Sequence, residues 1–137
     1  MLHVIFACVH NAGRSQMAAA LFNALCDPNI ARASSAGTAP AERVHPTVVT
    51  AMQEIGIDVT DRRPTRLTSE LAATADLLVT MGCGEECPVV PGVRRQDWPL
   101  PDPAGQPAEA VRQIRNQIAS LVRQLLKAEN VLPRSGR

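Results

Sequence analysis

Apolar runs and helical periodicities alternate along the first part of the chain. Residues 2–7 form a nearly unbroken apolar run with turn-prone neighbours, which is typical of a buried parallel strand. A helical stripe follows and ends at Asp27-Pro28-Asn29. Its members are Met17, Ala20, Leu21, Ala24 and Leu25. Residues 30–36 then predict a second strand, closed by Gly37.

The middle of the chain continues this alternation. A second helix is predicted by Val48, Val49, Met52 and Ile55, with Gly56 at its C-terminal end. A short third helix opens at Leu67-Thr68, where Thr68 is a suitable N-cap. Residues 77–81 again have the pattern of a buried strand.

The last part of the chain is a long loop followed by a helix. Residues 82–105 are rich in Gly, Pro and acidic side chains, and we interpret them as a functional loop with a short strand near Val93. The final helix has an apolar stripe of Val111, Ile114, Ile118, Leu121, Val122 and Leu125. Its other face carries Arg112, Arg115, Arg123 and Lys127, which we interpret as a solvated surface.

Strands that alternate with helices predict an α/β fold: a small parallel sheet with helices on both faces. We expect one catalytic domain over residues 1–132 and a disordered tail over 133–137. Ligands of such sheets bind at the carboxyl ends of the strands, and the segment that begins at Cys8 lies at such an end.

Composition narrows the class of protein. The 137 residues are 45% hydrophobic and 20% charged, and the net charge of +1 gives no field that would attract a nucleic acid or a membrane. No apolar run reaches the length of about 20 residues that a membrane span requires, and the start resembles no signal peptide. We therefore expect a cytoplasmic monomer. In a reducing compartment the 4 cysteines indicate chemistry rather than a disulfide framework.

The segment from residue 8 to residue 15 carries the strongest chemical signal. It reads Cys8, Val9, His10, Asn11, Ala12, Gly13, Arg14 and Ser15. A loop of this length between a strand and a helix directs several backbone N–H groups at one point, where the helix N-terminus adds positive charge. Gly13 and Asn11 can both adopt left-handed conformations there. We predict that the whole loop binds a tetrahedral oxyanion.

Three side chains of this loop have predicted roles. Cys8 is the nucleophile, and the positive environment favours its thiolate. Arg14 can grip two oxygens of the anion, and Ser15 can donate a hydrogen bond to the sulfur. The alternative is that Cys8 is a buried hydrophobic residue and Arg14 a surface charge. His10 either orients the anion or faces solvent.

Asp102-Pro103 lies in the Pro-rich loop before the last helix. An acid at this place could approach the site and protonate a leaving oxygen. The alternative is an ordinary Asp-Pro turn.

With these motifs the chain resembles the low-molecular-weight protein tyrosine phosphatase family over nearly its whole length. That fold hosts phosphotyrosine phosphatases and arsenate reductases that are usually reduced by thioredoxin. Two stretches resemble the reductases: Ser15-Gln16-Met17-Ala18 and Asp102-Pro103-Ala104-Gly105. The phosphatases usually have tyrosines after Asp-Pro, whereas this chain contains no tyrosine.

The resemblance implies a thiol relay. Cys8 attacks arsenate, Cys83 attacks Cys8 and releases arsenite, and Cys87 moves the disulfide to an exposed Cys83–Cys87 loop. A thioredoxin-like protein then reduces it, or a small thiol with a glutaredoxin-like partner does so. Many relatives have a longer insert between the last two cysteines than the 3 residues here. Ala19 replaces a Glu that accompanies a potassium ion in some relatives, so we predict neither this ion nor any bound cofactor or metal.

Alternatives remain for several residues. Cys83 and Cys87 could instead be part of a zinc site or plain loop thiols, although no second ligand pair accompanies them. Cys26 is interpreted as a packing residue, and His3 and His45 as structural. Trp98 either packs the Asp102 loop or lines the mouth of the site. Arg62 and Arg63 could add positive charge near it.

Three functions compete. The first is arsenate reduction, with weak phosphatase activity expected alongside it. The second is a phosphatase acting on phosphotyrosine or small phosphate esters, which needs only Cys8, Arg14 and Asp102. The third is a non-catalytic module that senses oxyanions or redox state, for which Cys8 and Asp102 would be superfluous.

Overall fold

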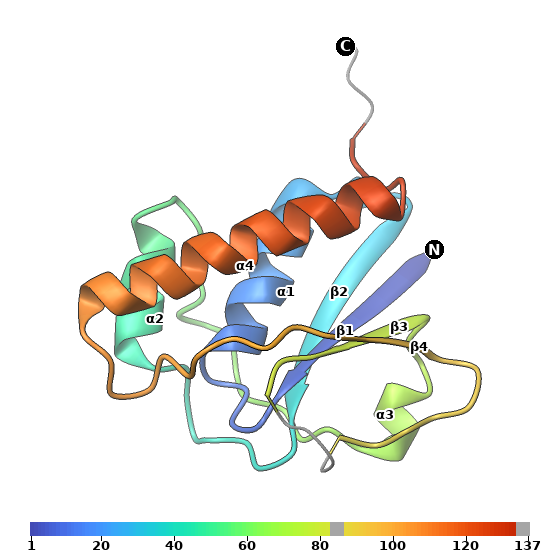
Figure 1. Cartoon of the computed structure of the whole chain (residues 1–137), viewed down its shortest axis with the longest axis horizontal. Helices are drawn as coiled ribbons and strands as arrows, with labels where there is room; N and C mark the ends of the chain where they lie inside the picture. The colour runs from blue at the N-terminus through green and yellow to red at the C-terminus, as the bar shows by residue number, and fades with distance from the viewer. Residues whose placement is uncertain (83–86, 134–137) are drawn as a thin grey trace.

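The computed structural model describes residues 1–82 and 87–133. In chain order the elements are β1 (Leu2–Cys8), α1 (Arg14–Leu25), β2 (Ala31–Gly37), α2 (Pro46–Gln53), α3 (Ser69–Ala72), β3 (Leu77–Thr80), β4 (Arg94–Asp97) and α4 (Ala108–Ala128). This order confirms the predicted alternation of strands and helices (Figure 1).

The strands form one parallel sheet with the order β2-β1-β3-β4. The central strand β1 pairs with β2 on one side, so that Cys8 lies opposite Gly37, and with β3 on the other, so that Ala7 lies opposite Thr80. The carboxyl ends of these strands therefore meet at one edge of the sheet, and the loop that follows Cys8 begins there.

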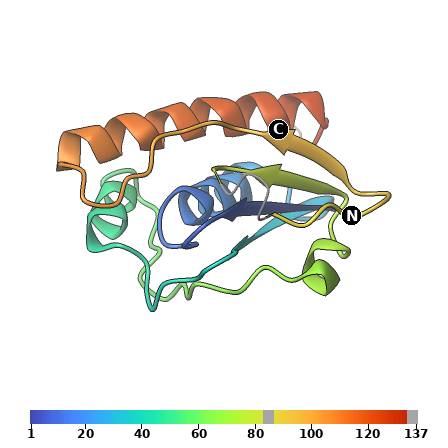
Figure 2. The same cartoon turned by 60° about the horizontal axis from the view of Figure 1, so that its bottom comes forward.

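Side chains of β1 alternate between two apolar clusters, as the pleat of a strand requires. Val4 and Phe6 belong to the large cluster with residues of α1, α2 and α4. Ile5 and Ala7 belong to a smaller cluster with Ala72 of α3. Helices thus cover both faces of the sheet, as predicted (Figure 2).

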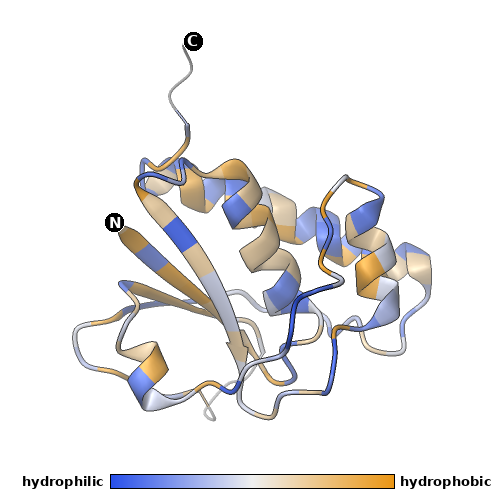
Figure 3. Ribbon diagram, turned by 180° about the vertical axis from the view of Figure 1, so that it is seen from behind, coloured by the Kyte–Doolittle hydropathy of each residue, from blue (hydrophilic) through white to orange (hydrophobic). Residues whose placement is uncertain are grey.

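Two boundaries differ from the sequence pattern. Helix α1 begins at Arg14, before its apolar stripe starts at Met17, because its first turn closes the loop after β1. Strand β4 lies just after Val93, but all its side chains are exposed and no hydrophobic pattern marks it. Hydrophobic and hydrophilic positions alternate along α4, whose apolar stripe packs in the large cluster (Figure 3).

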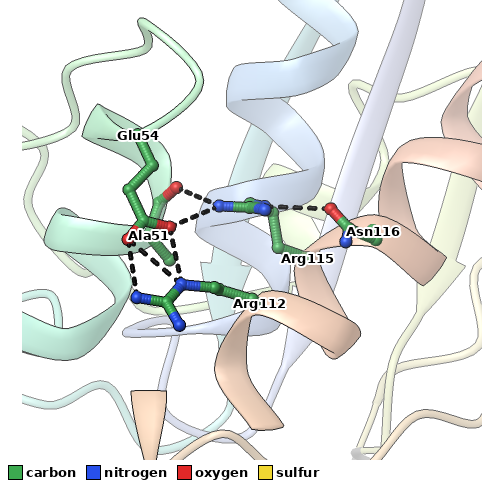
Figure 4. Close-up of polar contacts among 5 residues, drawn as sticks. All are labelled: Ala51, Glu54, Arg112, Arg115 and Asn116. Atoms are coloured by element: carbon green, nitrogen blue, oxygen red, sulfur yellow. Dashed lines mark hydrogen bonds and ion pairs between the residues drawn. The ribbon is translucent and has the colours of Figure 1, made fainter. Parts of the chain in front are cut away.

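The prediction of a solvated polar face on α4 is wrong at Arg115. Its side chain is buried, and Nη1 donates to the carbonyl of Ala51 over 2.7 Å and to Glu54 over 2.8 Å. Arg112 donates to the same carboxylate, so both guanidinium groups converge on Glu54 (Figure 4). The last turn of α2 leaves carbonyls without helical partners. Arg115 of α4 supplies the donor for one of them, the carbonyl of Ala51.

Among the residues the structure describes, no helix is long and apolar enough to cross a membrane.

Candidate active site

The loop after β1 turns its carbonyl groups outward. The carbonyls of residues 8–13 accept hydrogen bonds from the backbone N–H groups of Thr38, Ala39, Ala41, His45 and Met17 and from the side chain of Gln16. Because the C=O and N–H of a peptide group point in opposite directions, the N–H groups of residues 9–14 face the interior of the loop. A concave group of inward N–H donors at the N-terminus of α1 is an anion-binding arrangement.

Asn11 and Gly13 shape this loop in different ways. Asn11 has the predicted left-handed conformation, with φ of 51°. Gly13 does not, since its φ is −138°. Glycine is required there by a close approach instead, because a β-carbon on Gly13 would lie 2.6 Å from Cγ of Pro103. The Asp102-Pro103 turn therefore packs directly on the loop.

The sulfur of Cys8 lies in a buried chain of polar contacts. Its Sγ is 2.8 Å from Oγ of Ser15, which is the predicted hydrogen bond. Ser15 in turn accepts a hydrogen bond of 2.7 Å from Nδ2 of Asn11. The exposed fractions of Cys8 and Ser15 are 2% and 0%. Ser15 thus places its hydroxyl group against the buried sulfur.

The sequence pattern did not identify the residues that hold Asn11 in this set of polar contacts. Oδ1 of Asn11 accepts from the backbone N–H of Thr65 over 2.8 Å, and Gln16 donates to the carbonyl of Asn11 over 3.0 Å. Gln16 was noticed only as part of a family-like stretch. Its position directly after the Cys8–Ser15 motif was the one available signal. The contact of Thr65 depends on a distant segment, so no local pattern indicates it.

Arg14 bridges the loop and the Asp102 turn. Its Nη1 donates to the carbonyl of Leu100 over 3.1 Å, and Nη2 lies 3.8 Å from the Asp102 carboxylate. Asp102 itself accepts a hydrogen bond from the backbone N–H of Ala104, and 46% of its side chain is exposed. The structure thus brings the thiol of Cys8, a guanidinium group and a carboxyl group to one edge of the sheet.

The remaining candidates lie around this site or away from it. His10 is exposed, with Nδ1 3.2 Å from the carbonyl of Ala39. Trp98 is buried against Phe6 with ring centroids 5.5 Å apart, so it packs in the core and does not line a mouth of the site. The ring of His3 is buried between the carbonyl of Thr74 and the hydroxyl of Ser34, which agrees with a structural role.

Other side chains have simple surroundings. The backbone N–H of His45 donates to Ala12 at the start of α2. Cys26 is buried, as expected for a packing residue, and burial raises the pKa of its thiol. Arg62 and Arg63 line a polar surface hollow of about 410 Å³ with Glu42 and Asp61, so acidic groups accompany their charge.

The cysteine pair is described only in part. Cys83 lies outside the described residues. Cys87 is disulfide-bonded and only 2% exposed, packed in the smaller apolar cluster. The expectation of an exposed loop is therefore wrong for Cys87, because apolar neighbours on that face of the sheet cover it. Among the described residues, no group of three or more His, Cys, Asp and Glu side chains could hold a metal.

Known proteins are similar to this chain in sequence and in fold. The chain is 35% identical over 129 residues to the glutaredoxin arsenate reductase of Synechocystis sp., which covers 92% of this chain and 97% of the relative. It is similar to the solved thioredoxin-dependent arsenate reductase of Corynebacterium glutamicum, with 36% identity and a TM-score of 0.83 over 95% of this chain. It spans 62% of that structure's length.

A phosphatase has a similar fold. The low molecular weight protein tyrosine phosphatase of T. tengcongensis is 25% identical, with a TM-score of 0.82, over 93% of this chain and 99% of that one. Residues 3–132 match the family described as low molecular weight phosphotyrosine protein phosphatase. The match covers nearly all of the sequence, and the chain therefore belongs to the low molecular weight phosphotyrosine protein phosphatase family.

Proposed function

We propose that this protein is an arsenate reductase in which Cys8 is the nucleophile. Reduction of arsenate to arsenite takes two electrons, and two thiols supply them when they form a disulfide. The observation that carries the proposal is that Cys87, on the segment after β3, is a disulfide-forming cysteine in addition to the thiol of Cys8. The names of the most similar relatives agree with this reaction.

The first step is attack on the bound oxyanion. The inward N–H groups of residues 9–14 and the guanidinium of Arg14 hold the arsenate oxygens in this scheme. Cys8, whose sulfur lies against the Ser15 hydroxyl, attacks as the thiolate. An S–As bond forms while one As–O bond breaks, and Asp102 donates the proton with which that oxygen leaves as water.

The second step transfers the electrons. The thiolate of Cys83 attacks Sγ of Cys8, so that an S–S bond forms and the S–As bond breaks. The electron pair of that bond stays on arsenic, which leaves as arsenite. Cys87 then attacks Cys83 and restores the thiolate of Cys8.

An external dithiol completes the cycle. A thioredoxin-like protein, or a small thiol with a glutaredoxin-like protein, reduces the disulfide of Cys83 and Cys87 and is itself oxidised. Cys87 is buried in the described conformation, so an external dithiol does not reach its sulfur there. We also propose that the protein acts as a monomer, and that residues 1–132 form one catalytic domain.

The test is arsenate-dependent oxidation of NADPH in the presence of thioredoxin and thioredoxin reductase. The reduced wild type should turn over repeatedly, whereas Cys8→Ser, Cys83→Ser and Cys87→Ser should not. Cys26→Ser is the matched control, since Cys26 lies outside the site and should be dispensable. Repeated turnover by Cys83→Ser or Cys87→Ser would exclude the relay.

Hydrolysis of phosphate esters is the second candidate. The contact of Arg14 with Asp102 and the Cys8–Ser15 hydrogen bond are sufficient for it, and the similarity to a phosphatase structure favours it. The expected result is weak hydrolysis of an aryl phosphate that requires Cys8 but survives Cys83→Ser. Brisk hydrolysis without any arsenate-dependent turnover, with either type of reductant, would replace the first proposal by this one.

A further inference from the structure

Gly82 lies directly against the guanidinium group of Arg14. A β-carbon on Gly82 would overlap Nη1 of Arg14 and would lie 3.2 Å from Cζ and 3.5 Å from Nη2. The atoms it meets belong to the end of a long side chain and not to the backbone. A side chain at position 82 would therefore displace the guanidinium while the fold persists.

The guanidinium is held on its other sides. Nη1 donates to the carbonyl of Leu100, Nη2 lies near Asp102, and only 7% of Arg14 is exposed. Gly82 therefore completes a slot in which the group has little freedom to shift without losing one of these contacts. Bidentate recognition of an oxyanion requires such a fixed orientation, because two parallel N–H donors must meet two oxygens.

We propose that Gly82 is a positioning residue for oxyanion binding: its missing side chain gives the Arg14 guanidinium its place at the anion loop. The inference rests on the proposed function only in taking Arg14 as the anion-binding group. It applies equally to arsenate and phosphate. Gly82 immediately precedes Cys83 in the sequence, so the proposed constraint falls on the residue next to that cysteine.

The chain offers matched controls for the backbone strain at this position. Gly82 has φ of +102°, which side chains rarely adopt, so any substitution there also strains the backbone. Gly56 and Gly92 have φ of +81° and +85°, and a β-carbon on either would meet nothing within 4 Å. Alanine at these two positions likewise places a side chain at a positive φ, without contact with Arg14.

The experiment measures protection of Cys8 by inorganic phosphate. The fully reduced wild type, Gly82→Ala, Gly56→Ala and Gly92→Ala are alkylated with iodoacetamide, and the modified Cys8 peptide is quantified by mass spectrometry at increasing phosphate concentrations. We expect Gly82→Ala to raise the half-protecting concentration about tenfold or more, the effect of one lost charge-assisted hydrogen bond. Gly56→Ala and Gly92→Ala should stay within about twofold of the wild type.

A double-mutant cycle tests whether Gly82→Ala weakens phosphate binding through Arg14. Lysine lacks the Nη1 atom that the β-carbon would overlap, so adding Gly82→Ala to Arg14→Lys should not weaken phosphate binding further. Gly82→Asn, paired with Gly92→Asn, replaces the alanine variants if they unfold, because asparagine tolerates a positive φ better. We expect the half-protecting phosphate concentration of Gly82→Asn to exceed that of Gly92→Asn by about tenfold.

Three results would overturn the proposal. The first is a half-protecting phosphate concentration that is the same for Gly82→Ala and the wild type. The second is that Gly82→Ala weakens phosphate binding as much in the Arg14→Lys variant as in the wild type. The third is that phosphate does not protect wild-type Cys8. Phosphate protection involves no electron transfer. A failure of arsenate-dependent NADPH oxidation would therefore refute the reductase and leave the role of Gly82 standing.

Discussion

Asn11 donates a 2.7 Å hydrogen bond to Oγ of Ser15, the atom that lies 2.8 Å from Sγ of Cys8. Nδ2 occupies one acceptor site of that oxygen and leaves the hydroxyl proton available to Sγ of Cys8. The orientation of the Asn11 amide is itself fixed, because its Oδ1 accepts from the backbone N–H of Thr65, which can only donate. A backbone amide of a distant segment thus holds the Asn11 side chain against Ser15.

Replacing the hydrogen-bond donor of residue 11 by an acceptor tests this arrangement. In Asn11→Asp a carboxylate replaces the amide and accepts the Ser15 proton, so the sulfur of Cys8 loses its donor. We expect alkylation of Cys8 by iodoacetamide at pH 7 to slow about tenfold, the value of one hydrogen bond to a charged group. Ser15→Ala should slow it to a similar degree. The rate is measured on the Cys8 peptide by mass spectrometry.

The same substitution elsewhere on α1 is the control. Asn23 connects α1 to the backbone of Ala33 through two hydrogen bonds, and it makes no contact with Cys8. Asn23→Asp should reduce stability and leave the rate at Cys8 within about twofold. An equal slowing in both variants would mean that lost stability, and not the direction of the hydroxyl, controls the thiolate.

Asp102 is expected to act on the leaving oxygen and not on anion binding. Asp102→Asn retains the hydrogen bond from Ala104 but cannot donate the proton, so aryl phosphate hydrolysis should fall about a hundredfold or more. Protection of Cys8 by phosphate should remain. Asp27→Asn, at the opposite edge of the sheet, is the matched control and should hydrolyse at the wild-type rate. An unchanged rate in Asp102→Asn would remove the acid from the mechanism.

The Glu54 cluster predicts a pH-dependent contribution to stability. The hydrogen bond from Arg112, followed by that from Arg115, holds the pKa of Glu54 below its usual range. A lowered folded-state pKa stabilises the protein above the unfolded-state pKa of about 4.3 and loses this effect as the pH falls through the folded value. Urea unfolding of wild type and Glu54→Gln should therefore differ most at neutral pH and converge as the pH falls through the lowered folded-state pKa of Glu54. A difference that is the same at every pH would contradict the ion pairs.

The sequence predicts the fold well where burial produces a pattern. Residues 2–7 and the stripe from Met17 to Leu25 are covered by the core, so their periodicity marks β1 and α1. Strand β4 consists of Arg94, Arg95, Gln96 and Asp97, all exposed, and it forms by pairing with β3. The sequence indicated a short strand near Val93, but no pattern within β4 gives its bounds, because pairing with β3 forms it.

In the candidate site, too, contacts between residues close in sequence could be predicted and contacts between remote residues could not. The spacing from Cys8 to Ser15 is local, so the hydrogen bond between these residues could be predicted. Two further contacts of the site come from residues that are remote in sequence and carry no chemical signal of their own. Thr65 donates to Asn11, and Gly82 lies against Arg14. Arg115 was misassigned for the same reason, because its acceptor is a backbone carbonyl of another helix.

Cys26 provides a test of which thiols take part in the chemistry. Cys26 is 4% exposed, and desolvation raises the pKa of its thiol, so little thiolate exists at neutral pH to attack another sulfur. We expect Cys26→Ala to lower the free energy of unfolding by about 1 kcal/mol through a small cavity and the lost contact with the carbonyl of Ala31. Arsenate-dependent NADPH oxidation should be unchanged, whereas Cys87→Ala should abolish it. Urea unfolding and the coupled assay measure the two effects separately, and a loss of turnover in Cys26→Ala at full stability would bring Cys26 into the relay.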